Sequence, residues 1–205
     1  MNITKYLAIS GILMPSVLWL AILILGALTP DYNHIEDAIS LLGQIGAPYM
    51  IYMNLFGFFT TGILMALFAY GIRSLFKYEK RSLVGPTLFI LAGLSFASIG
   101  YLPYDVENLS ATVNIVHIAA VVLSVSLGAA SSVFVYLEIR KGDSILSPLA
   151  KPTLYIGLFS LSTISMFFLR DYIGLIQRVN LSLITIWMVI ASVRMYMYSN
   201  SELSK

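Results

Sequence analysis

The sequence predicts an all-α integral membrane protein, a single domain over residues 1–205 built as a bundle of six transmembrane helices. Of the 205 residues, 59% are hydrophobic and only 11% are charged, whereas charged residues make up about 25% of an ordinary soluble domain. The charges fall in short clusters between long apolar runs. A run of about 20 residues crosses a hydrocarbon core roughly 30 Å thick. Because these runs do not alternate, they indicate helices rather than barrel strands.

Six apolar runs place the helices in order. The first is longer than the apolar core of a signal peptide and has no clear cleavage site, so we expect it to be retained. Pro15 within it is tolerated in a membrane helix, where we expect a kink. Pro103 ends the third run, and charged polar loops follow the second and fourth. The expected helices cover residues 7–29, 50–76, 84–102, 111–139, 153–169 and 175–198.

Lysine and arginine predict the orientation. If the N-terminus is cytoplasmic, ten of the twelve lysines and arginines face the cytoplasm, and only Arg170 and Arg178 face outward. The outer face then carries six of the ten acids and both histidines. The positive-inside rule therefore predicts a cell-membrane protein with both termini in the cytoplasm.

Composition also narrows the chemistry. The chain contains no cysteine, which excludes disulfides, thiolate metal sites and cysteine nucleophiles. It has no basic arm, so we expect no nucleic-acid partner. No motif for a nucleotide, a metal or another cofactor is present, and we expect none of these. The expected partners are membrane lipids, and a homo-oligomer or a partner in a membrane complex is compatible with the pattern.

Residues 30–54, PDYNHIEDAISLLGQIGAPYMIYMN, form an unusually long and patterned link between the first two helices. They hold three of the ten acids and one of the two histidines, but no lysine or arginine. We expect a structured cap on the outer face, with an interfacial or re-entrant segment at residues 30–49, too short to span the membrane. If it is helical, Asp37, Ser40 and Gln44 share one face. That face is either a solvated edge or the lining of a site.

His117 is the most telling group inside an expected helix. It lies about five residues from the outer end, roughly 8 Å deep, where an ionisable side chain usually faces the bundle or a wet cavity. Asn114 lies one turn before it, and small residues continue its side of the helix. Three interpretations remain open: a structural histidine in a packing seam, a group that handles protons or contacts substrate, and, least favoured, a metal ligand with His34 and nearby acids. The small residues are Ser124, Gly128 and Ser131.

Arg178 opens the sixth expected helix, and Ser182, Thr185 and Ser192 continue its side as a polar stripe. The arginine either reaches for headgroups or makes a fork-like contact with a phosphate or an outer acid, Asp37 or Asp105. Arg170 lies close by in the preceding loop. Trp187 falls on another side of this helix and is expected to pack. Asn108 begins a glycosylation sequon on the expected outer face.

Several of these segments together resemble the DUF998 family of membrane proteins. The elements are DAISLLGQIGAP followed by Asn54, GYLPYD after the third helix, His117, and GLIQR with Trp187, and they cover nearly the whole chain. The pattern of that family includes an acid before Arg178, where this chain has Gln177. The family itself implies no reaction.

The chain is more loosely similar to the eukaryotic Frag1/DRAM/Sfk1 group. That similarity implies six helices with cytoplasmic termini. Members of that group act in GPI-lipid remodelling, phosphoinositide homeostasis or autophagy, so it also implies work on or beside lipid. It rests on Ile39, Ser40, Gly43, Pro48 and His117.

Three functional hypotheses follow. The first is a protein whose polar outer-leaflet pocket binds a lipid headgroup or small amphiphile. The second is an intramembrane lipid-modifying enzyme with His117 as general base and an acid that orients it. The third is a non-catalytic partner subunit. The candidate catalytic residues are His117, Asp37 and Asp105, and the candidate substrate-binding residues are Ser40, Asn54, Asn114, Arg170 and Arg178.

Overall fold

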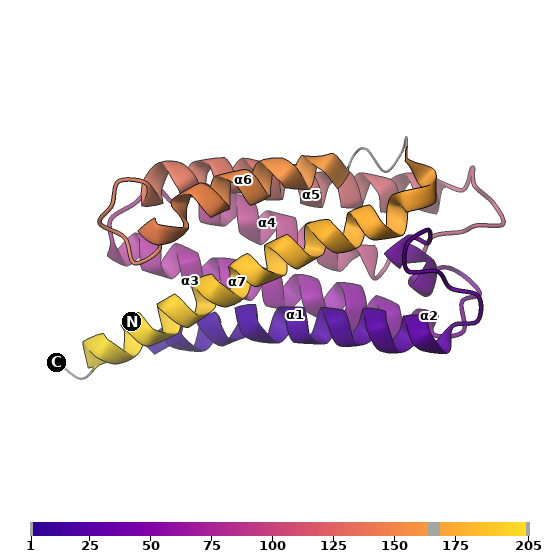
Figure 1. The fold of residues 1–205 in the computed structure, drawn as a ribbon, viewed down its shortest axis with the longest axis horizontal. Helices are drawn as coiled ribbons and strands as arrows, with labels where there is room; N and C mark the ends of the chain where they lie inside the picture. The colour runs from indigo at the N-terminus through magenta and orange to yellow at the C-terminus, as the bar shows by residue number, and fades with distance from the viewer. Residues whose placement is uncertain (1, 164–168, 204–205) are drawn as a thin grey trace.

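The structure is a computed structural model that describes residues 2–163 and 169–203, and every regular element in these ranges is helical (Figure 1). The main helices form one elongated bundle, and short helical pieces join some of them. The main helices are α1 (Asn2–Leu28), α3 (Thr61–Tyr78), α4 (Val84–Ile99), α5 (Thr112–Ile139), α6 (Ala150–Ser160) and α7 (Ile173–Leu203). The short pieces are η1 (Ile39–Gly43), α2 (Met50–Tyr52), η2 (Met53–Thr60), η3 (Ser147–Leu149) and η5 (Arg170–Tyr172).

Five helical runs in the described ranges are long and apolar enough to cross a membrane, which makes the chain a multi-pass membrane protein. The six-span prediction is not confirmed, because α6 has only 11 residues and a span needs about 20. The five runs are Ile3–Leu28, Met50–Tyr78, Val84–Tyr101, Thr112–Ile139 and Arg170–Asn200.

The expected helix at residues 153–169 differs most from the structure. Its α-helical part begins earlier, at Ala150, and ends at Ser160, where the Ser160 hydroxyl donates to the carbonyl of Gly157 at 2.6 Å. A hydroxyl that bonds the backbone in this way weakens the helix around it. Residues 164–168, which the prediction also covered, lie outside the described ranges.

The second expected helix is continuous but contains a π-helical segment. α2, η2 and α3 follow one another without a break, and the π segment, η2, covers Met53–Thr60. The hydroxyl of Thr61, the first residue of α3, donates back to the carbonyl of Phe56 in η2 at 3.0 Å. π segments are rare and often occur at functional sites. Here the end of α4 packs closely on it, because a Cβ at Gly100 would overlap the carbonyl oxygen of Asn54.

The helices pack in a simple order. α1 contacts α3 and α7, α3 contacts α4, α4 contacts α5, and α5 contacts α6. α7 runs diagonally across the bundle (Figure 1). Gly62 and Gly93 let the backbones of α3 and α4 approach closely, since a Cβ at either would collide with backbone atoms of the other helix, as is common in membrane bundles.

The bundle has two distinct ends (Figure 1). Both chain termini lie at one end, together with the loops at residues 79–83 and 140–149; we call it the terminal end. The other end, the cap end, carries residues 30–49, which we call the cap segment, and the loop at residues 102–111.

The cap segment is structured, but its helix is much shorter than expected. Only Ile39–Gly43 is helical, as a single 3₁₀ turn. Asp37 and Gln44 lie outside that turn, so the expected helical face shared with Ser40 is wrong. The reason is local chemistry: an oxygen of Asp37 accepts a hydrogen bond from the amide of Asn33 at 2.7 Å, and Gly46 adopts a positive φ of 82°, which glycine tolerates best.

Candidate functional site

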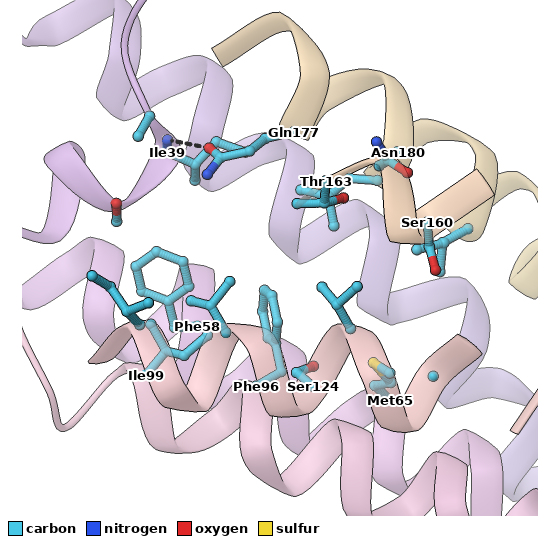
Figure 2. Close-up of a pocket in the computed structure, with 18 of the residues that line it drawn as sticks. Ile39, Phe58, Met65, Phe96, Ile99, Ser124, Ser160, Thr163, Gln177 and Asn180 are labelled. Carbon is cyan, nitrogen blue, oxygen red and sulfur yellow. Dashed lines mark hydrogen bonds between the residues drawn. The ribbon is translucent and has the colours of Figure 1, made fainter. Parts of the chain in front are cut away.

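A cavity of about 690 Å³ lies inside the bundle between α3, α4, α5, α6 and α7, with η1 at its cap end (Figure 2). Its lining runs along α5 from His117 to Val135, a rise of roughly 27 Å. Along α7 it runs from Ile173 to Trp187, roughly 21 Å. The cavity is therefore long and narrow, and its axis follows the helices.

The mouth of the cavity lies at the cap end. The exposed lining residues there are Glu36 in the cap segment, Leu109 in the 102–111 loop and Arg170 in η5. Ser40 lines the cavity beside them. The mouth thus combines one cation, one acid and one hydroxyl.

The wall below the mouth is chemically apolar. Phe58, Phe96 and Met65 project into the cavity from one side (Figure 2). Two of the serines of α5 that line it turn their hydroxyls onto α4: Ser124 donates to the carbonyl of Ala92 at 3.0 Å, and Ser131 to that of Gly85 at 2.8 Å. Because these hydroxyls already have partners, they hold two helices together and add little polarity to the cavity.

The far end of the cavity has an aromatic floor. The rings of Phe68, Phe89 and Trp187 meet edge to face at centroid distances of 6.0 to 6.1 Å. The indole nitrogen of Trp187 donates to the hydroxyl of Thr153 at 2.9 Å. The expectation that Trp187 packs is therefore confirmed, but this side chain also lines the cavity.

Asn180 is a buried polar group on the cavity wall (Figure 2). Its amide nitrogen donates to the carbonyl of Ile176 at 3.0 Å and to the hydroxyl of Ser162 at 3.3 Å. Its Oδ1 has no hydrogen-bond partner in the described residues. Unpaired buried acceptors are costly, so this oxygen is a natural contact for a donor on a ligand. At the sequence level Asn180 stands out only as the first residue of an Asn-Leu-Ser sequon inside an expected helix, which does not point to a cavity.

His117 lines the cavity and is held by the backbone. Its Nδ1 lies 2.6 Å from the carbonyl oxygen of Leu102, and since a carbonyl only accepts, Nδ1 carries the proton. The neutral ring then leaves Nε2 as an acceptor. The ring of Tyr104 packs edge to face at 5.6 Å. The residue is 3% exposed.

Asn114 and Asp105 shape the 102–111 loop beside His117. The side-chain oxygen of Asn114 accepts from the amide of Asp105 at 2.7 Å, and its nitrogen donates to the carbonyls of Asp105 and Asn108. One carboxylate oxygen of Asp105 accepts from the amides of Glu107 and Asn108, each at 3.0 Å. Both side chains are used in fixing the loop.

Arg178 fastens the cap segment to α7. Its guanidinium donates to the hydroxyl of Tyr32 at 2.7 Å and to the carbonyls of Gly174 and Asp37 at 2.9 and 3.2 Å. It also lies 2.9 Å from Nδ1 of His34, which must accept, because the guanidinium only donates. Burial and the nearby positive charge of Arg178 lower the pKa of His34, which favours the neutral acceptor. Burial also raises the pKa of Tyr32.

Gln177 adds a second bond between the cap segment and α7. Its Oε1 accepts a hydrogen bond from the amide of Ile39 at 2.8 Å (Figure 2). The amide of Leu175 in turn donates to the carbonyl of Ile35 at 2.9 Å. A neutral amide oxygen at position 177 therefore bonds the first residue of η1.

The candidates from the sequence thus fall into two groups. Some line the cavity, and the others hold its roof and the adjoining loop. Asn54 belongs to the second group: its nitrogen donates to the carbonyl of Gly43 at 2.9 Å. The lining candidates are His117, Ser40 and Arg170; the others are Asp37, Asp105, Asn54, Asn114 and Arg178. No cluster of three or more metal-ligating side chains occurs within residues 2–163 and 169–203.

The helices and the cavity define a class: a multi-pass membrane protein with a long apolar interior space and a polar mouth at one end. The chain belongs to the DUF998 family, described as proteins of unknown function, whose profile matches residues 12–194. No curated protein and no solved structure matches the chain significantly. The looser similarity to the Frag1/DRAM/Sfk1 group is not confirmed by these comparisons.

Proposed function

We propose that the protein binds a lipid or another amphiphile, with an acyl chain of the ligand in the cavity and its headgroup at the mouth. The observation that carries this proposal is the shape of the cavity: it is long, its wall is mostly apolar, and its charged lining residues, Glu36 and Arg170, lie only at the cap end. One leaflet of a bilayer is about 15 Å deep. A lining that rises roughly 27 Å along α5 accommodates an acyl chain of that depth.

The mouth provides the selectivity in this proposal. The free energy of a lipid chain is similar in the bilayer and in an apolar cavity, so burial of the chain alone does not favour binding to the protein. Arg170 and Glu36 offer one charge of each sign, and Ser40 offers a hydroxyl. His117 adds an acceptor at Nε2 just inside the mouth. These groups suit a headgroup that carries a phosphate or carboxylate together with hydroxyl or amine donors.

We also propose that the cap end faces outward and both termini face the cytoplasm. Among the described residues, Arg170 and Arg178 are the only lysines or arginines near the cap end, and the nine others lie toward the terminal end. The positive-inside rule supports this orientation, which puts the mouth in the outer leaflet.

The enzyme hypothesis has less support from the contacts. The imidazole ring of His117 is hydrogen-bonded to the backbone carbonyl of Leu102. In the described residues, the carboxylates of Asp37 and Asp105 accept bonds from backbone amides and not from this ring. A general base lacks its orienting acid in this arrangement. The partner-subunit hypothesis leaves the cavity and the free oxygen of Asn180 without a role.

Gly128→Phe should narrow the cavity and weaken selective lipid retention about tenfold. Gly128 lines the cavity, and a Cβ there would meet nothing within 4 Å, so the ring has room to enter without moving the helices. A ligand chain and the ring would compete for one space at a cost of about 1–3 kcal/mol, or about a tenfold loss of retained ligand. Mass spectrometry of the lipids that co-purify with each variant measures this.

Two matched variants control this test. Gly128→Ala should keep the ligand, and Leu123→Phe adds the same ring at an exposed position of α5. A lipid profile that matches the bulk membrane in the native chain, or one that Gly128→Phe leaves unchanged, would refute the proposal.

A further inference from the structure

A second cavity, of about 240 Å³, lies at the terminal end of the bundle, away from the first. Its lining comes from the start of α1, the last turns of α3 and the end of α7, which Figure 1 shows meeting at this end. The volume equals that of about eight water molecules at about 30 Å³ each. It is therefore large enough for a phosphate group with some of its hydration.

Two cations line this cavity, and no acid balances them in the part of the chain whose side chains the structure describes. Arg73 and Lys77 stand four residues apart on α3, so they lie on the same face one turn apart. No aspartate or glutamate is among the described lining residues. Neither cation has an ion pair in the described part of the chain. At the same end of the bundle, Arg81 and Lys141 do pair with acids.

A buried hydroxyl in the lining also lacks a partner. Ser199 on α7 is fully buried, at 0% exposure, and its Oγ has no hydrogen-bond partner in the described residues. A desolvated hydroxyl without a partner costs free energy. An anionic oxygen in the cavity would accept a hydrogen bond from this hydroxyl. The hydroxyls of Tyr70 and Ser74 come from the adjoining face of α3.

An anion in this cavity would be bound by side chains and not by the dipole of α3. The C-terminal end of α3 presents the negative end of the helix dipole, which attracts Arg73 and Lys77 but repels an anion. The dipole alone explains two basic residues near a helix end. It does not explain a cavity beside them or the orphan hydroxyl of Ser199. Basic pockets between membrane helices near the headgroups are typical sites for anionic lipids.

We propose that this cavity binds a phosphate group, with Arg73 and Lys77 as its charge partners and Ser199 as a hydrogen-bond donor. The ligand chemistry is a phosphate ester, which an anionic phospholipid headgroup supplies at this depth. The proposal is independent of the function of the first cavity, because the two share no lining residue.

Native mass spectrometry of the full chain in detergent tests this proposal. Phosphatidylglycerol, phosphatidylcholine, glycerol phosphate and inorganic phosphate are each titrated. Each cation in direct contact with the bound phosphate should contribute about fivefold to binding, so Arg73→Gln/Lys77→Gln should weaken phosphatidylglycerol binding about 30-fold. Ser199→Ala keeps both charges and should weaken it about tenfold.

A control variant with the same loss of charge separates this site from general surface attraction. Lys80→Gln/Lys151→Gln removes two exposed cations that do not line the cavity and should leave the affinity within about twofold of the native value, since exposed charges contribute little. Binding of glycerol phosphate or inorganic phosphate with the same variant dependence would support the site and identify a soluble source. Equal phosphatidylglycerol binding by the native chain and Arg73→Gln/Lys77→Gln, or an equal loss in the control, would overturn the proposal.

Discussion

Arg81→Ala should lower the free energy of unfolding by about 3–5 kcal/mol, the usual cost of removing one partner from a buried ion pair. The side chains of Arg81 and Glu79 are 5% and 10% exposed, and Nε of the arginine lies 2.5 Å from the carboxylate. Nη1 also donates to the carbonyl of Glu138 at 2.7 Å. The alanine variant leaves Glu79 buried and charged without a cation. Unfolding with increasing sodium dodecyl sulfate in micelles measures the change.

Asp143→Asn provides the control for this cluster. Asp143 also pairs with Arg81, at 2.6 Å, but its side chain is 76% exposed, so its loss should shift the unfolding midpoint far less than Arg81→Ala does. The hydroxyl of Ser144 donates to Glu79 at 3.2 Å, so the cluster joins the loops at residues 79–83 and 140–149. Equal unfolding midpoints for Arg81→Ala and the native chain would show that the cluster does not stabilise the fold.

Arg178→Leu should release the cap segment from α7. The guanidinium bonds Tyr32, His34, Gly174 and the carbonyl of Asp37. At about 1 kcal/mol for each bond, we expect a loss of about 2–4 kcal/mol in local stability. The amides that depend on this contact belong to residues 33–41. Hydrogen exchange measured by mass spectrometry should show them exchanging at least tenfold faster, while α4 stays protected.

Arg170→Leu is the matched control for Arg178→Leu. Arg170 is exposed and lies in η5, just before α7. The cap segment should therefore keep its protection from hydrogen exchange in this variant. If both variants leave the exchange of residues 33–41 unchanged, Arg178 does not anchor the cap. If both speed it equally, the effect is one of charge and not of the specific bonds.

Arg178 also shows what the sequence could predict. Its position near the cap was correct, because the outer end of the last helix and the cap segment both follow from hydropathy and charge. The expected partners were headgroups, a phosphate, or the carboxylate of Asp37 or Asp105, but Arg178 bonds the backbone carbonyl of Asp37. The choice between two acceptors of one residue depends on the backbone turn, which no local pattern encodes.

Only some of the residues that line the cavity could be predicted from the sequence. The spacing of Ser124, Gly128 and Ser131 placed them on the side of His117, and all of them line the cavity. The same spacing would also be expected for small residues that pack one helix against another. The two serines do both, because their hydroxyls bond α4 as well as lining the cavity. Open space beside them depends on the diagonal course of α7 (Figure 1), a property of the whole bundle. Asn180 was overlooked for the same reason.

Fluorescence of Trp187 tests most directly whether a lipid chain occupies the cavity. The chain has two tryptophans, so Trp19→Phe leaves Trp187 as the only one. Trp187 lines the far end of the cavity and is 8% exposed, which shields it from the surrounding bilayer. Lipids brominated along the acyl chain quench tryptophan only on contact.

We predict strong quenching of Trp187 by brominated lipid in the Trp19→Phe chain and a marked loss of that quenching when Gly128→Phe is added. Trp187 fluorescence that brominated lipid leaves unchanged, or quenches equally with and without Gly128→Phe, would show that no lipid chain reaches the interior of the bundle.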